Sequence, residues 1–253
     1  MRIAVLLKQI PDLVEDLELA PDGTDVDREF LAFTLNEFDD QALEEALCLK
    51  DAGDAEVVAV ALEEPDVDQC LYTALAKGAD RAVKLTGAGE GWIDGHRRSA
   101  ILAAWLATAE FDLILTGVQA ADDLDGQLPP LLAARLGLPH ASVVVRVELK
   151  GQVALVRQEL GGGTVADEEL RLPAVIGIQA ARQAPRYASI SRIRQAQQAG
   201  GLEEVGAPAT DAGPGYHLVR LLAPEAAGHA QMLGGSAGEV AERIVELIRA
   251  KGL

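Results

Sequence analysis

Apolar runs alternate with amphipathic segments through most of the chain. Runs in which nearly every position is apolar predict strands buried on both faces, and they occupy residues 2–8, 56–62, 81–85, 112–116 and 173–179. Segments with apolar positions three and four apart predict helices, and they occupy residues 39–51, 65–77, 100–109 and 125–136. This alternation predicts an α/β protein with a doubly wound, mostly parallel sheet that carries helices on both faces.

The pattern changes in the second half of the chain. Residues 141–150 and 152–160 are rich in β-branched residues and predict a hairpin that turns at Gly151. Residues 200–215 are rich in Gly, Ala and Pro and have no periodicity, which predicts an extended, loop-like arm.

Capping signals mark the ends of the first and last predicted helices. Asp39 or Asp40 can cap the helix that starts there. Ser236 and Glu239 form a capping box that opens a terminal amphipathic helix. We expect a first domain of residues 1–199, followed by an arm and terminal helix in residues 200–253.

The composition is that of a strongly acidic protein with enough apolar residues for a large core. The chain has 253 residues, of which 49% are hydrophobic, and a formal net charge of −18. Such a charge repels nucleic acids and anionic membrane surfaces. No apolar run approaches the ~20 residues needed to span a bilayer, and the first residues become polar too early for a secretory signal. Cys48 and Cys70 lack CxxC spacing and are interpreted as small buried apolar residues. We expect a cytoplasmic protein.

Residues 113–130, LILTGVQAADDLDGQLPP, contain the most informative loop. An apolar strand that ends in glycine and leads into a helix is typical of a phosphate-binding corner. This loop, however, carries Asp122, Asp123 and Asp125. A calcium loop needs about six oxygen ligands, and the segment that follows supplies none, so no metal site is predicted. Helix capping by Asp125 and phosphate binding by backbone N–H groups both remain open.

Residues 183–198, QAPRYASISRIRQAQQ, predict a helix that begins at Ser189. Ile190 and Ile193 would share one face of it. The pattern alone favours packing of this face on the chain's own domain, and the alternative is an exposed apolar anchor for a partner. In residues 157–163, RQELGGG, the glycines predict a tight turn and Glu159 points outward. No nucleophile–base arrangement is present, so no catalytic residue is predicted.

The chain resembles the β subunit of electron transfer flavoproteins (ETFs). The matching stretches run in order through nearly the whole sequence, and the most specific is PRYAS after a strand of the type LPAV. Earlier stretches are LLKQIPD (6–12), LNEFDDQALEEALCLKD (35–51), ALAKGADRAVKL (74–85), LILTGVQAADDLDGQ (113–127) and VRQELGGG (156–163). The segment DVDREF before LNEFDD is most similar to ETFs that serve methylated-amine dehydrogenases.

The resemblance implies a fold, cofactors and partners. The fold would be an adenine-nucleotide-hydrolase-like α/β sandwich, in a heterodimer with a larger α subunit whose mobile domain holds FAD. The β subunit would bind a structural AMP and dock a flavin-dependent dehydrogenase, and electrons would pass to ETF-quinone oxidoreductase or a similar acceptor. In electron-bifurcating members, a second FAD replaces AMP and NADH binds nearby. An alternative from another class is a free-standing universal-stress-type nucleotide-binding module, which the β-rich second half disfavours.

The resemblance also assigns roles to residues. The nucleotide pocket would comprise the end of the first strand, Asn36 and the acidic loop, that is Leu7, Lys8, Gln9, Asn36, Val118, Gln119, Ala120, Asp122, Asp125, Gly126 and Gln127. Leu13 would lie near the flavin ring, and Glu159 would pair with an arginine of the flavin domain. Tyr187, Ile190 and Ile193 would dock the dehydrogenase. Two positions depart from the common loop pattern: Leu124 replaces an aspartate and Pro129 a glycine.

Overall fold

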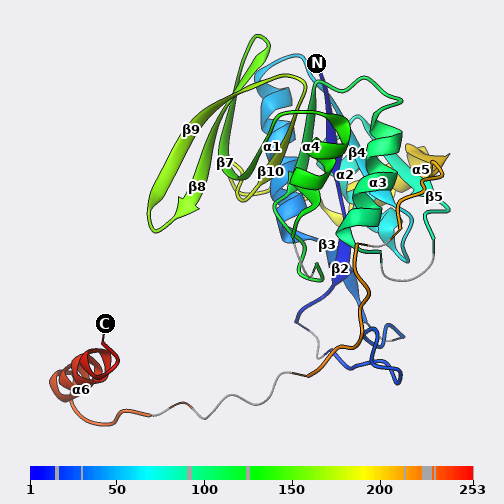
Figure 1. Ribbon diagram of the computed structural model, residues 1–253. Helices are drawn as coiled ribbons and strands as arrows, with labels where there is room; N and C mark the ends of the chain where they lie inside the picture. The colour runs from blue at the N-terminus through cyan, green and yellow to red at the C-terminus, as the bar shows by residue number, and fades with distance from the viewer. Residues whose placement is uncertain are drawn as a thin grey trace.

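The computed structural model describes residues 1–14, 17–29, 31–89, 93–123, 126–213, 215–223, 230 and 232–252. Within these residues, nine strands form one sheet in the order β11-β5-β4-β1-β6-β10-β7-β8-β9 (Figure 1). Neighbouring strands from β11 to β7 are parallel, whereas β7, β8 and β9 pair antiparallel. The strands are β1 (Arg2–Leu6), β4 (Glu56–Leu62), β5 (Arg81–Thr86), β6 (Leu113–Gly117), β7 (His140–Lys150), β8 (Val153–Gly161), β9 (Thr164–Arg171), β10 (Ala174–Ile178) and β11 (Leu202–Gly206).

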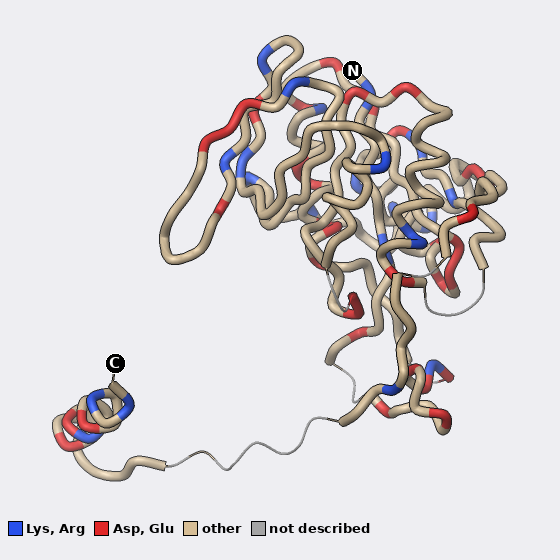
Figure 2. Tube along the Cα trace, in the orientation of Figure 1, with Lys and Arg blue, Asp and Glu red and all other residues tan. Residues whose placement is uncertain are grey.

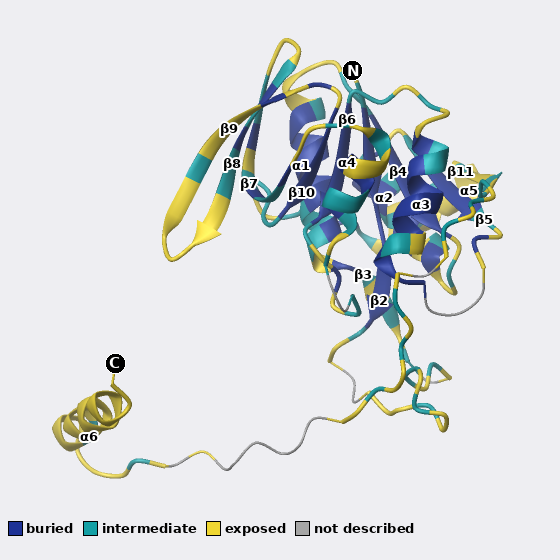
Figure 3. Ribbon diagram, in the orientation of Figure 1, coloured by how far each residue is buried: buried dark blue, intermediate teal, exposed yellow. Residues whose placement is uncertain are grey.

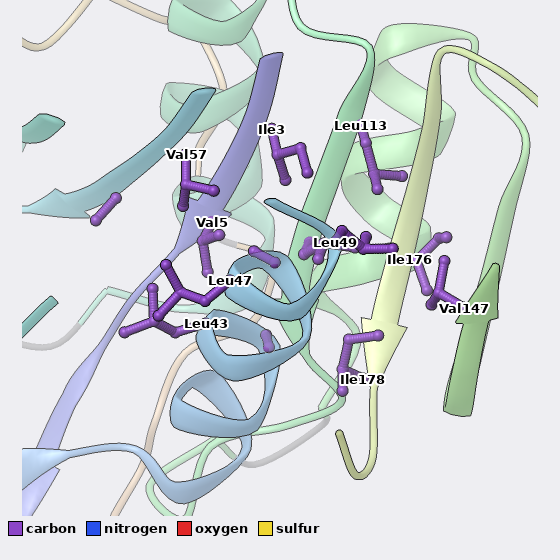
Figure 4. Packing of buried hydrophobic residues seen from close by; sticks show 14 of the residues in the cluster. Ile3, Val5, Leu43, Leu47, Leu49, Val57, Leu113, Val147, Ile176 and Ile178 are labelled. Carbon is purple, nitrogen blue, oxygen red and sulfur yellow. The ribbon is translucent and has the colours of Figure 1, made fainter. Parts of the chain in front are cut away.

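Helices cover both faces of this sheet, as the alternation predicts. The helices of the described residues are α1 (Glu37–Ala52), α2 (Val67–Lys77), α3 (Gly95–Leu106), α4 (Leu128–Leu136), α5 (Ile190–Ala199) and α6 (Ala237–Ala250). Apolar residues of α1 and α2 build the core on one face, and those of α3 and α4 build it on the other. Strand β1 contributes to both cores. Ile3 and Val5 belong to the core on the α1 side (Figure 4), and Ala4 and Leu6 belong to the core on the opposite side. The predicted doubly wound α/β fold is confirmed.

Helices α1 and α2 each begin two residues from the predicted start, and α3 and α4 begin further from it. Helix α3 begins at Gly95, because the Asp94 side chain accepts a hydrogen bond from Arg97 N at 2.8 Å and caps the helix there. Helix α4 begins at Leu128, with Gln127 in the N-cap position. Asp125, the predicted cap of α4, lies outside the described residues.

The predicted hairpin is part of a three-stranded antiparallel extension. Strands β7 and β8 pair as predicted, but the chain then turns at three glycines and returns as β9, which was not predicted. Strand β9 forms one edge of the sheet and exposes the consecutive acids Asp167, Glu168 and Glu169 (Figure 2). The periodicity of apolar residues does not predict β9, because its sequence is polar and neither of its faces is apolar.

The loop-like arm predicted for residues 200–215 is wrong in part, because it contains strand β11. This strand pairs parallel with β5 at the other edge of the sheet. Leu202 packs against one core and Val205 against the other. Glu203 pairs with Arg81 at 2.7 Å and Glu204 pairs with Lys84 at 2.8 Å. The strand thus depends on partners about 120 positions earlier, which local composition does not reveal.

A second, short sheet was also not predicted. Strands β2 (Gln9–Pro11) and β3 (Phe33–Leu35) pair antiparallel just beyond β1. They form the base of the excursion of residues 12–32, whose described part extends away from the main sheet (Figure 1). The later arm crosses the excursion, since Leu221 N donates to the Gly23 carbonyl at 2.7 Å. The arm also contacts the start of α3, where Gly215 N donates to Asp94 Oδ2 at 3.0 Å.

The predicted terminal helix is present as α6. The Ser236–Glu239 capping box forms, with Ser236 N donating to Glu239 Oε2 at 2.8 Å. None of its described residues is buried, and Ile244, Val245, Leu247 and Ile248 are 37–46% exposed. The helix therefore presents an apolar face that the rest of the described chain does not cover (Figure 3). No described helix combines the length and apolar character needed to cross a membrane.

Candidate functional site

The order in which strands are added to the sheet reverses between β1 and β6. From β1 it builds β4 and β5 on one side, and it then returns to place β6 on the other side of β1. Ligands of doubly wound sheets bind outside the carboxyl ends of the strands at such a switch point. The segments that follow β1 and β6 are therefore where a site is expected.

Asp39, in the first turn of α1, joins these two strand ends. Its Oδ2 accepts a hydrogen bond from Lys8 N, and its Oδ1 accepts one from Gly117 N, both at 2.9 Å. Burial raises the pKa of Asp39 to about 7, although hydrogen bonds from Asn36, Gly117 and Lys8 oppose the rise. The prediction that Asp39 or Asp40 caps α1 is wrong, because Asn36 occupies the N-cap position.

Gly117 leaves no room for a side chain at this junction. A Cβ atom there would lie 2.5 Å from Asp39 Oδ1 and 2.7 Å from the Phe38 backbone carbon. Asn36 completes the junction, because its N–H donates to the Lys8 carbonyl and its Nδ2 donates to the Gln119 carbonyl, each at 2.9 Å. The start of α1 thus holds the ends of β1 and β6 in a fixed relation.

The acidic loop folds onto Lys8. The ammonium group of Lys8 lies 2.6 Å from Asp122 Oδ1 and 3.0 Å from Asp123 Oδ1. Asp123 Oδ2 also accepts a hydrogen bond from Ala120 N at 3.0 Å. Both described aspartates therefore act as hydrogen-bond acceptors that shape the loop.

A cavity of about 560 Å³ opens beside this junction. It is lined by Lys8, Gln9, Pro11, Asp25, Arg28, Phe33, Glu63, Glu64, Pro65, Gly89, Ile93, Arg98 and Asp122. Its volume lies within the range of small-molecule and cofactor sites, about 300–1,000 Å³. The side chain of Gln9 is buried, yet neither its Oε1 nor its Nε2 has a hydrogen-bond partner among the described residues. Arg98 Nε is likewise buried and has no hydrogen-bond partner among the described residues.

The charges around the cavity are balanced in pairs. Lys8 pairs with Asp122, Arg28 with Asp25, and Arg98 with Glu64. Burial by itself would lower the pKa of Arg98, but the adjacent Glu64 carboxylate raises it above its usual range. Among the described residues, no group of three or more His, Cys, Asp and Glu side chains is arranged to hold a metal ion.

The predicted nucleotide residues fall into two groups. Lys8, Gln9 and Asp122 line the cavity. The others either form the junction and the acidic loop or pack behind them: Leu7, Asn36, Val118, Gln119, Ala120, Gly126 and Gln127. Leu7 is buried in the core on the α1 side, so it supports the site from behind. Asp125 lies outside the described residues.

Leu13 lies apart from this group, at a second and smaller cavity of about 210 Å³. Leu13 is 59% exposed and lines it together with Leu218 and Leu221 of the arm. Both cavities share Asp25 and Arg28 in their linings, so the Asp25–Arg28 ion pair lies between the two. The structure therefore places Leu13 next to the larger cavity without making it part of the lining.

Glu159 and the predicted docking residues lie on other surfaces. Glu159 is exposed on β8, opposite Val165 of β9, in the antiparallel extension (Figure 1). Tyr187 and Ile190 are 80% and 65% exposed, whereas Ile193 is half-buried. The interpretation that the pattern favours, with Ile190 and Ile193 packed on their own domain, is therefore wrong for Ile190, which stays exposed, and agrees with the half-burial of Ile193.

Sequence reasoning missed Asp39, Arg28 and Arg98 as residues of the site. Arg28 lies in the excursion and Arg98 in the first turn of α3, so only the tertiary fold brings them to the cavity. The sequence gives one local indication that Asp39 has a special role. Asn36 takes the N-cap position of the helix three residues earlier, so the Asp39 side chain is not needed as a cap. That signal does not name its partners, which are backbone groups of two other segments.

Comparisons with known proteins agree with this fold. A family model described as the electron transfer flavoprotein domain matches residues 26–210. The chain is 36% identical over 259 residues to the electron transfer flavoprotein subunit beta of Methylophilus methylotrophus, with 98% of each chain covered. It is 34% identical to the subunit of the same name in Clostridium acetobutylicum, over 76% of this chain and 74% of that one. It is 30% identical to the caffeyl-CoA reductase-Etf complex subunit CarD of Acetobacterium woodii, with 99% of each chain covered.

A doubly wound sheet with a cofactor-sized cavity at its switch point defines an α/β protein of the ligand-binding type. The matches above assign it more narrowly. The chain belongs to the electron transfer flavoprotein family, a family of flavin-binding electron carriers, and it is similar over 98% of its length to the β subunit from Methylophilus methylotrophus. It therefore does not belong to the universal-stress class considered as an alternative.

Proposed function

We propose that this chain is the β subunit of a heterodimeric electron carrier and has no catalytic activity of its own. The α subunit would hold FAD, and this chain would bind one AMP in the switch-point cavity. The observation that carries the nucleotide proposal is the buried Gln9 amide, which lines the cavity with both polar atoms unpartnered among the described residues. The edge of an adenine base offers the donor and the acceptor that such an amide requires.

The phosphate of AMP would lie at the junction of β1 and β6. Every cation of the cavity lining is paired with a carboxylate, so a phosphate would be held by backbone N–H groups of the loop or would replace Asp122 on Lys8. Replacement is feasible because Asp123 keeps Lys8 paired at 3.0 Å when Asp122 leaves.

The remaining surfaces would serve the flavin and the partners. FAD supplies the electron-carrying chemistry, and Leu13 and Glu159 would help to seat and orient it. Tyr187, Ile190 and Ile193 would dock a dehydrogenase of the methylated-amine type as donor. ETF-quinone oxidoreductase or a similar protein would accept the electrons. The uncovered apolar face of α6 supports packing of residues 200–253 on the α subunit, apart from β11, which pairs within this chain. The heterodimer would work in the cytoplasm.

The decisive measurement is the cofactor content of the complex. The chain is co-expressed with its α subunit, the purified complex is denatured, and the released FAD and AMP are quantified by chromatography. One FAD and one AMP per heterodimer is the expected result. Two FAD and no AMP would instead assign the chain to the electron-bifurcating type, with its own FAD and an NADH site.

A matched variant tests whether Gln9 holds the nucleotide. Gln9→Leu keeps the volume of the side chain and removes both polar atoms, so the purified complex should lose most of its AMP and keep its FAD. Full AMP content in that variant would place the nucleotide elsewhere. Lys150→Leu, which changes a residue at the far end of β7, controls for a general effect of substitution.

A further inference from the structure

Helix α1 buries two adjacent glutamates. The side chains of Glu44 and Glu45 are 0% and 1% exposed, in a helix whose neighbouring positions Leu43, Ala46 and Leu47 belong to the core. A buried carboxylate is strongly unfavourable unless charged and hydrogen-bonding partners compensate it. The position of these partners therefore indicates what the two acids hold in place.

Apart from the Cys48 thiol of the same helix, which donates to Glu44 Oε1 at 3.5 Å, the partners come from one segment, residues 179–189, which joins β10 to α5 and is called the connector below. Gln41, Glu44 and Glu45 lie three and four positions apart on α1, so they form one stripe that faces the connector. Gln41 Oε1 accepts from Ala181 N at 2.9 Å, and Glu45 lies 2.6 Å from the Arg182 guanidinium. Arg182 also donates through its backbone N–H to Glu45 Oε2 at 3.0 Å.

Glu44 makes the larger set of contacts, at the end of the connector next to α5. Arg186 donates to Glu44 from its backbone N–H at 2.8 Å and from its guanidinium at 3.0 Å. Gln183 Nε2 donates to Glu44 Oε1 at 2.7 Å, and Asp51 holds the outer side of Arg186 at 2.9 Å. Burial alone would raise the pKa of Glu44, but these hydrogen bonds lower it below its usual range, so the carboxylate stays charged.

Helix α5 lies on the surface of the sheet domain, where it packs against α2. None of its residues is buried, and Ile190 at its first position is 65% exposed. Contacts at its two ends supplement the packing on α2. The connector ties the first end to α1, and β11, which follows Gly200 and Gly201, ties the second end to β5. Tyr187 and Ile190 follow Arg186 directly, so Glu44 acts on the end that carries the exposed apolar side chains.

We propose that Glu44 is a positioning residue for partner docking: through Arg186 it fixes the orientation in which Tyr187 and Ile190 are presented to the electron donor. This inference rests on the proposed docking role of α5. Glu44 itself is buried, so its effect on docking passes through the connector residues that it binds, mainly Arg186, which makes most of its hydrogen bonds, with Gln183 beside it.

The test uses the intact α–β complex and two variants of the contact. Glu44→Gln keeps the shape of the side chain but has only one acceptor oxygen for the four donor groups of Gln183 and Arg186. Its amide N–H₂ must therefore face one of these donors. Arg186→Lys, at a partly exposed position, keeps the charge and loses the forked geometry, so it serves if the first variant folds poorly. Asp40→Asn is the matched control, because it removes an ion pair between α1 and Lys77 and leaves the hydrogen bonds between Glu44 and Arg186 in place.

The kinetic measurement takes a methylated-amine dehydrogenase, reduced by its amine substrate, as the electron donor. We expect Glu44→Gln and Arg186→Lys to raise the KM for the complex roughly tenfold with kcat little changed, since a misplaced anchor weakens encounter but not the later transfer. Asp40→Asn should leave KM as in the wild type. A KM equal to that of the wild type in both Glu44→Gln and Arg186→Lys would overturn the inference.

A double-variant cycle separates positioning from a general loss of structure. Ile190→Asp removes the apolar anchor directly, so Glu44→Gln should add little further loss in that background. If the losses caused by Ile190→Asp and Glu44→Gln multiply in the double variant, Glu44 acts elsewhere, and the inference would be overturned. Normal electron transfer in Ile190→Asp alone would instead overturn the docking role of α5, and with it the proposed function of this surface.

Hydrogen exchange of the complex without any donor tests the structural step by itself. Glu44→Gln should speed exchange of backbone N–H groups in the connector and α5 and leave β7, β8 and β9 as in the wild type. Unchanged exchange in α5 would mean that Glu44 does not hold it, whatever the donor.

Discussion

Asp39 should make the fold less stable as pH rises through neutrality. Its pKa is about 7 in the folded protein, because burial disfavours the charge, whereas an aspartate of the unfolded chain has its ordinary pKa of 3.8. Between these values, the unfolded chain has lost a proton that the folded chain keeps. The contribution of Asp39 to stability is therefore fully present below about pH 4 and is lost as pH rises through about 7.

The size of the effect follows from the separation of the two pKa values. Each unit corresponds to about 1.36 kcal/mol, so a separation of about three units gives a total of about 4 kcal/mol. About 2.6 kcal/mol of this falls between about pH 5 and about pH 8, a range that stays above the isoelectric pH of about 4.5.

The perturbation is Asp39→Asn, which cannot titrate. Urea unfolding of the full chain, followed by circular dichroism, is measured for wild type and variant across that pH range. The variant has one poor contact, since its N–H₂ must face the N–H of Lys8 or Gly117, but this cost does not depend on pH. The stability of wild type relative to variant should therefore fall by about 2.6 kcal/mol from about pH 5 to about pH 8. Glu37→Gln removes an exposed acid from the same helix start and controls for the change in net charge.

The reasoning fails if the difference between wild type and Asp39→Asn is flat across the range. It also fails if the wild type gains relative stability as pH rises. The second outcome would mean that the two backbone N–H donors outweigh burial and hold the pKa of Asp39 below its usual range.

Three further substitutions have defined outcomes. Gly117→Ala should lower the free energy of unfolding by about 1–3 kcal/mol in urea titrations and reduce AMP content, because the new Cβ meets Asp39, whereas Gly206→Ala, with open space around it, should be close to neutral. Ile190→Asp should abolish electron transfer from the donor dehydrogenase without lowering the Tm, since this side chain is exposed. Glu159→Ala should change the orientation of the flavin domain, seen by small-angle scattering of the complex, and AMP lost from this variant would show that Glu159 has another role.

The sheet was predictable where burial alone determines the pattern. Strands β1, β4, β6 and β10 lie in the middle of the sheet under helices on both faces, so each reads as a continuous apolar run. Strands β9 and β11 lie at its edges, where one side of the strand is free and polar residues are tolerated. Their existence depends on pairing with distant segments, which periodicity cannot express.

The candidate site was predictable as a location and not as a set of contacts. The glycine at the end of β6 and the acidic loop pointed to the switch point, and Lys8, Gln9 and Asp122 do line its cavity. Asp39 and Glu44 lie in the same apolar helix segment and look alike in sequence. Their different roles come from what folds against them: two strand ends in one case, and the connector in the other.

Strand β9 leaves one row of its backbone N–H and C=O groups without a neighbouring strand in the described part of the chain. Such an edge can template pairing with a second molecule of the same chain. Alignment of two β9 edges would bring Asp167, Glu168 and Glu169 of one copy against the same acids of the other. The charge should therefore keep copies apart at neutral pH, and light scattering should show self-association only as the solution approaches the isoelectric pH of about 4.5, where the net charge of the chain approaches zero.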